Sequence, residues 1–147
     1  MSLWDWALAV YERPGVPETC LKLQDEYGQN TSLLLWAIQA RPADMVLDRA
    51  ARTARAWDET ALHPLRVVRR GLKAPCPPVA DAAREGLRED VKAAELRAER
   101  VLLETLERLS DGSGGARSAL DAATAASQAW GRPAPVETLA ALADAVA

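Results

Sequence analysis

Apolar residues recur along nearly the whole chain at the three- and four-residue spacing of α-helices, and no stretch of useful length alternates as a β-strand does. Prolines, glycines and capping residues divide this pattern into segments. The pattern therefore predicts an all-α fold, organised as a single-domain helical bundle of about five to seven helices.

The first third of the chain carries the clearest helix boundaries. Ser2 followed by Asp5 matches a capping box, which predicts a helix from about Leu3 to Glu12. Asn30 or Thr31 can cap a later helix that is apolar nearly all round. Such a helix is expected to be the buried element against which the others pack.

Prolines set the boundaries further along. A helix that begins near Pro42 is expected to break at His63-Pro64, because proline disfavours helical geometry in the residue before it. Pro64 can then be the first residue of a short helix that runs from Leu65 to Lys73. Residues 75–78 are proline-rich and predict an extended linker.

The longest predicted helix covers residues 79–109. Apolar residues recur along it in a near seven-residue repeat: Leu87, Val91, Ala94, Ala98, Val101 or Leu102, and Leu109. A coiled-coil dimer seam fits this repeat, and so does a single amphipathic helix packed on its own domain. The alanines within the repeat favour the second interpretation.

Residues 1–110 are predicted to form one helical domain. Residues 111–147 are predicted to form a Gly/Ser hinge followed by an Ala-rich helical tail. Alanine favours helix but buries little surface, so this tail is expected to be peripheral or partly disordered.

Composition limits the possible activities. The chain carries a net charge of −3 and one histidine, which disfavours nucleic acid as a partner and a metal site built on a histidine pair. No established catalytic or nucleotide motif occurs, so a non-catalytic protein without a cofactor or metal is expected. Cys20 and Cys76 lack paired spacing, and no membrane span or signal peptide is evident, which favours a cytoplasmic protein.

Four cations on the short helix of residues 64–73 form the main candidate for binding. Arg66, Arg69, Arg70 and Lys73 have the spacing of one helical face. They repel one another unless a negative group lies near. That group can be a phosphate, an acidic partner, or the acidic residues of the 79–109 helix.

Three more residues complete the candidate site. Asp25 falls in the last turn of a predicted helix, where the helix dipole disfavours negative charge, so it is expected to have a partner. Backbone N–H groups near Asn30, or the indole N–H of Trp4 or Trp6, can supply one. Trp6 points roughly 200° around its helix from Trp4, so the helix carries aromatic side chains on two faces. Such a helix either packs between neighbouring helices or leaves one aromatic side chain for a partner.

Two functions follow. The favoured one is a non-catalytic interaction or adaptor module that uses the Arg66–Lys73 face and an aromatic patch, and its partner is another protein or a second copy of the chain. The alternative is a small anionic-ligand-binding protein, or an all-α enzyme, with a pocket near Asp25 and helix 64–73. A pocket of a few hundred Å3 shared by Asp25 and Arg66 or Arg69 favours the alternative. Pairing of the arginines with Glu95 or Glu99 removes the main support of both.

Several runs of residues resemble a family of small, uncharacterised, all-helical proteobacterial proteins, a domain of unknown function. The runs are Leu3-Trp4-Asp5-Trp6-Ala7-Leu8, Pro14-Gly15-Val16, Cys20-Leu21-Lys22-Leu23-Gln24-Asp25, Leu33-Leu34-Leu35-Trp36 and Pro64-Leu65-Arg66. The resemblance covers about residues 2–110. It implies a cytosolic all-α domain with no established activity.

Overall fold

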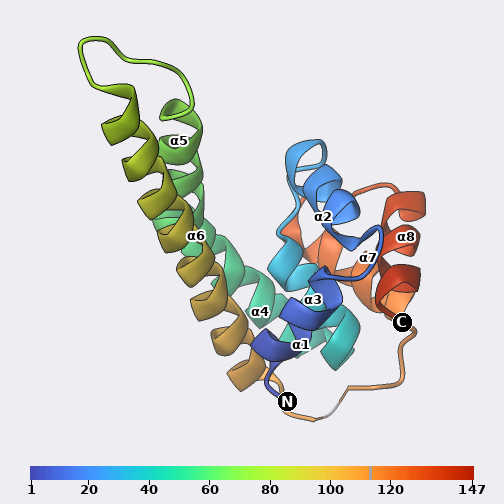
Figure 1. The fold of residues 1–147 in the computed structure, drawn as a ribbon. Helices are drawn as coiled ribbons and strands as arrows, with labels where there is room; N and C mark the ends of the chain where they lie inside the picture. The colour runs from blue at the N-terminus through green and yellow to red at the C-terminus, as the bar shows by residue number, and fades with distance from the viewer. Residues whose placement is uncertain (113) are drawn as a thin grey trace.

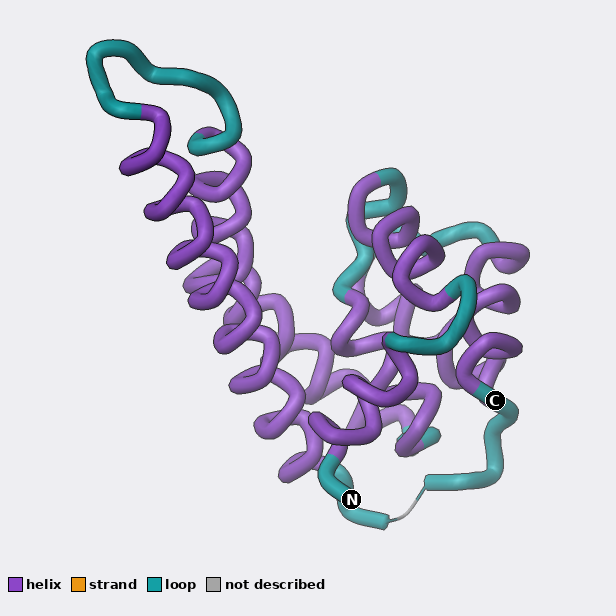
Figure 2. Tube along the Cα trace, in the orientation of Figure 1, coloured by secondary structure: helices purple, strands orange, loops and turns teal. Residues whose placement is uncertain are grey.

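The structure, a computed structural model, describes residues 1–112 and 114–147. All regular structure in these residues is helical, which confirms the predicted all-α class (Figures 1 and 2). The elements are α1 (Leu3–Tyr11), α2 (Val16–Asp25), α3 (Thr31–Ala40), α4 (Asp44–Trp57), the π-helical turn η1 (Asp58–Leu62), α5 (His63–Gly71), α6 (Asp81–Leu109), α7 (Ala119–Trp130) and α8 (Val136–Val146). Because α4, η1 and α5 are continuous, the described residues form seven separate helical rods.

The two predicted N-caps are present. The Ser2 hydroxyl accepts a hydrogen bond from the backbone N–H of Asp5 at 3.1 Å, which fixes the start of α1. The Asn30 side chain accepts one from the N–H of Leu33 at 2.9 Å, which fixes the start of α3. Both satisfy N–H groups that the first turn of a helix leaves unpaired.

Helix α3 forms the centre of the fold, as its apolar sequence predicts. Its residues 32–38 are all buried, and α6 and α7 pack against it. Trp36 is fully buried, and its indole N–H donates to the Ser110 hydroxyl at 2.8 Å. Because the indole N–H has a hydrogen-bond partner, this large side chain can be buried without leaving a polar group unsatisfied.

The predicted helix break at His63-Pro64 is wrong. His63 has helical dihedral angles, and its N–H donates to the carbonyl of Asp58, five residues earlier. The resulting π turn is wider than an α turn, and it lies where a proline ring would otherwise clash with the preceding carbonyl. The chain therefore continues from α4 through η1 into α5 without a break in the helix.

Helices α5 and α6 form an antiparallel hairpin, here called the arm, which projects away from the body formed by α1–α3, α7 and α8 (Figure 1). The 29 residues of α6 confirm the long predicted helix. Some residues of its predicted seven-residue repeat are buried and others are exposed. Ala98 and Leu102 are buried against the chain itself, whereas Leu87 and Val101 remain exposed.

The Ala-rich tail is helical, as predicted, and forms α7 and α8, but α7 is not peripheral. It packs against α3 and α4, and its Ala122, Ala123, Ala126 and Ser127 are buried. The Ser127 hydroxyl donates to Gln29 and accepts from the N–H of Ala134, both at 2.8 Å. The predicted boundary at residue 110 stays a prediction, and the predicted hinge includes Ser113, which lies outside the described residues.

Candidate functional site

The arginines of the predicted binding helix turn toward α6. Nε of Arg69 donates to the Glu95 carboxylate at 2.6 Å, and Nε of Arg66 donates to the same carboxylate at 3.1 Å. Arg66 also lies 3.7 Å from Glu99 and 3.5 Å from Asp58. Arg66 and Arg69 therefore pair within the chain, and the main support for a partner or a ligand at the Arg66–Lys73 face is lost.

This partly buried cluster holds more negative than positive charge. Three carboxylates, those of Asp58, Glu95 and Glu99, face two guanidinium groups. Burial raises the pKa of Asp58, and Arg66 and His63 oppose that shift only in part. Burial also raises the pKa of Glu99, with Arg66 opposing and Glu95 reinforcing the shift. The cluster thus favours a proton or another cation.

Arg70, Asp25 and Lys73 stay at the surface. Nη2 of Arg70 lies 3.3 Å from a carboxylate oxygen of Asp25, and both side chains are about half exposed. Asp25 therefore has the partner expected of an acid at a helix end, although the partner is an arginine of α5. The side chain of Lys73 is exposed, and its backbone carbonyl accepts from Arg84 at 3.2 Å.

Asn30 and Trp6 hold structural positions. The Asn30 side chain is buried and serves as the cap of α3. Trp6 is partly buried and packs against the core. A binding role for either residue stays a prediction.

A small cavity lies beside the Arg70–Asp25 pair. Its volume is about 130 Å3, and its lining includes Asp58, His63, Arg66, Arg70 and Trp130. Neither Asp25 nor Arg69 lines it, and it is smaller than the few hundred Å3 expected of a site for a drug-sized ligand. The anionic-ligand hypothesis therefore lacks the pocket that would favour it.

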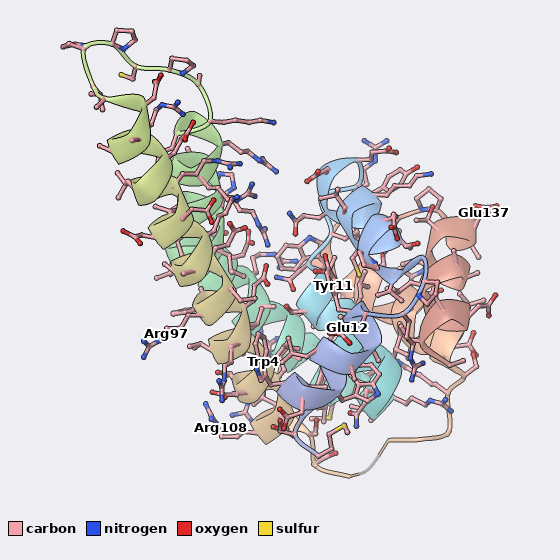
Figure 3. All side chains as sticks on the ribbon, viewed as in Figure 1. Trp4, Tyr11, Glu12, Arg97, Arg108 and Glu137 are labelled. Carbon is pink, nitrogen blue, oxygen red and sulfur yellow. The ribbon has the colours of Figure 1, made fainter. Side chains whose placement is uncertain are left out.

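The outer face of α6, turned away from α5, carries the exposed half of the seven-residue repeat. We call the surface of Leu87, Asp90, Ala94, Arg97 and Val101 the outer face of the arm. Leu87 is 52% exposed and Val101 is 38% exposed. Within the residues that the structure describes, the side chains of Asp90 and Arg97 form no hydrogen bond or ion pair, and Figure 3 shows Arg97 pointing outward.

A hollow of about 520 Å3 lies along this outer face. Its lining includes Trp4 of α1 and Ala93, Leu96, Arg97 and Val101 of α6. The Trp4 ring lies under the guanidinium of Arg100, 5.6 Å from the ring centroid, and so forms one wall of the hollow. The outer face thus combines apolar side chains, unpaired charges and a depression, which are features of protein-binding surfaces.

The sequence predicts a single seven-residue repeat along α6 and does not say which of its residues stay exposed. The signal that separates the two sides is the spacing itself. Leu87, Ala94 and Val101 recur at seven residues, and so do Val91 and Ala98, but the two sets lie on neighbouring stripes of one helix. Only the first set remains exposed.

Fold and site together define an all-α domain with a projecting helical hairpin whose outer face is apolar and carries unpaired charges. The chain belongs to a family described as a protein of unknown function (DUF2390), whose model matches residues 2–106. This match confirms the predicted family resemblance, and it includes the whole outer face. No curated protein matches the chain, and no solved structure matches it.

Two further observations concern metals and membranes. Among the described residues, no group of three or more His, Cys, Asp or Glu side chains is arranged to hold a metal ion. None of the helices in the same residues is long and apolar enough to cross a bilayer.

Proposed function

We propose that the chain is a non-catalytic interaction module that binds a second copy of itself through the outer face of the arm. The observation that carries the proposal is that this face is symmetric about its midpoint to within half a residue. Leu87 and Val101 are equally far along α6 from Ala94, and Asp90 and Arg97 are equally far from the point between Ala93 and Ala94.

A two-fold axis through this midpoint would place two α6 helices antiparallel. Asp90 of each copy would then face Arg97 of the other, and Leu87 of each copy would face Val101 of the other. A symmetric homodimer requires a surface that is complementary to itself in this way. The small side chains of Ala93 and Ala94 at the axis would let the helices approach closely.

The hollow beside Val101 supports the same arrangement. Leu87 of the second copy would enter the depression lined by Trp4, Leu96 and Val101. An exposed leucine that fills a pocket beside an aromatic side chain is the kind of contact that dominates the energy of many interfaces. Asp90 and Arg97 would lie beside it and set the antiparallel direction.

Molar mass by light scattering, across a range of concentrations, tests the proposal. The wild-type chain should form a dimer, and Leu87→Glu should form a monomer with an unchanged circular dichroism spectrum. Leu21→Glu on α2 is the matched control, because Leu21 is 56% exposed and lies on another surface. A monomeric wild-type chain at its highest soluble concentration, or a dimeric Leu87→Glu variant, would contradict the proposal.

A further inference from the structure

A second concave surface adjoins the hollow and lies between α6 and helices α1 and α3. It is a cleft of about 220 Å3 with mainly apolar walls. Those walls include Trp4, Leu8, Leu35, Leu96 and Leu103. Figure 3 shows Trp4 on the side of α1 that faces α6.

Four residues with polar side chains also line this apolar cleft. Glu99 contributes a carboxylate, Tyr11 a phenol, and Thr31 and Ser32 two hydroxyls. Within the described part of the chain, the Thr31 and Ser32 hydroxyls form no hydrogen bond. An apolar cleft with a few converging polar groups is typical of a site for a small ligand.

The charge of Glu99 indicates which ligand fits. Glu99 belongs to the partly buried cluster that has one carboxylate more than its guanidinium groups, and its contact with Arg66, at 3.7 Å, is the longest in that cluster. The first turn of α3 adds a partial positive charge of about half a unit, which does not offset a full carboxylate. An anion would therefore be repelled, and a cation would be held.

The aromatic walls fit a cation as well. The Trp4 ring already lies under the guanidinium of Arg100 on the outer side. Tyr11 adds a second ring at the cleft. Aromatic faces beside a carboxylate are a recurring means of binding ammonium groups.

We infer that the cleft between α1, α3 and α6 binds a small organic amine, with the ammonium group on Glu99 and the apolar part between Trp4, Leu8 and Leu96. The volume limits the ligand to roughly one ring with a short chain. Leu8, Tyr11 and Leu96 are each about half exposed, and the bound ligand covers them. The inference does not rest on self-association, because Glu99, Leu8 and Tyr11 lie outside the hollow on the outer face, whereas Trp4 and Leu96 line both the hollow and the cleft.

Calorimetric titration with three probes of one skeleton tests the inference: 2-phenylethylammonium, 2-phenylethanol and phenylacetate. The ammonium should bind with a Kd about tenfold smaller than the alcohol, and phenylacetate should not bind. Glu99→Gln should remove the preference for the ammonium and leave binding of the alcohol unchanged. Glu89→Gln, a carboxylate change on α6 in an exposed pair outside the cleft, should leave the preference intact.

Three results would overturn the inference. They are the absence of ammonium binding, equal affinities for the ammonium and the alcohol, and an undiminished preference for the ammonium in a folded Glu99→Gln variant. Circular dichroism establishes that each variant is folded. The light-scattering result for Leu87→Glu does not bear on any of these outcomes, so the two proposals fail separately.

Discussion

The Glu95 carboxylate accepts a 2.6 Å hydrogen bond from Nε of Arg69, and this contact attaches α5 to α6 within the arm. Arg66 donates to the same carboxylate, whose side chain is 11% exposed. Glu95→Gln should therefore lower the free energy of unfolding by about 1–3 kcal/mol, because the amide carries no negative charge and one oxygen replaces the two that accept from these largely buried guanidinium groups. Urea denaturation measures the change.

Glu89 provides the control on the same helix. It pairs with Lys92 at 3.0 Å in a pair open to solvent. Glu89→Gln should change the free energy of unfolding by less than about 0.5 kcal/mol, as is usual for surface pairs. Equal effects of the two substitutions would mean that the Glu95 pairing does not stabilise the arm.

Glu99 should destabilise the folded chain at neutral pH. Burial raises its pKa above the ordinary value of 4.5, so the folded chain binds this proton more readily than the unfolded chain. The contribution of Glu99 to the free energy of unfolding therefore falls as pH rises from the ordinary pKa through the raised one. Glu99→Gln should gain stability relative to the wild type over that interval, in thermal melts at several pH values. A pH-independent difference would contradict this account.

The two thiols should differ in reactivity. Cys20 is buried, and burial, with Glu99 adding to the effect, raises its pKa to about 12. Cys76 is exposed in the loop of the arm. A disulfide reagent at neutral pH should therefore label Cys76 fast and Cys20 only on unfolding, because the thiolate is the reactive form. Cys76→Ser should abolish the fast phase, and a fast phase that persists would show Cys20 to be accessible.

Ser127 should be required for the attachment of α7. Its buried hydroxyl joins Gln29, before α3, to the backbone N–H of Ala134, before α8. Ser127→Ala should lower the free energy of unfolding by about 1–3 kcal/mol, because two buried polar groups lose their partner. Gln128→Ala changes an exposed neighbour and should leave stability nearly unchanged. Similar stabilities of the two variants would contradict the role given to this network.

The local features of the fold could be predicted from sequence, because their causes are local. Ser2 and Asn30 cap α1 and α3 through side chains within three residues of the N–H groups they satisfy. The continuous burial of residues 32–38 follows from their apolar composition. The long helix α6 was recognisable from its repeat and its charges.

The remaining features depend on contacts that a single segment does not contain. Pro64 stays within a helix because a π turn precedes it, and no residue type marks such a turn. The alanines of α7 are buried because α3 lies against them, whereas composition alone suggests a weakly packed segment. Glu99 reaches the cleft only because α1 and α3 form its other walls.

Charge reversal at Asp90 and Arg97, measured by sedimentation velocity, tests self-association through the outer face most directly. Asp90→Arg alone and Arg97→Asp alone each place like charges opposite one another twice in the proposed dimer. Each should weaken the dimer by about 2 kcal/mol, or roughly thirtyfold in Kd. The double variant restores opposite charges and should recover the wild-type Kd. Single variants that dimerise like the wild type, or a double variant as weak as the singles, would contradict the account.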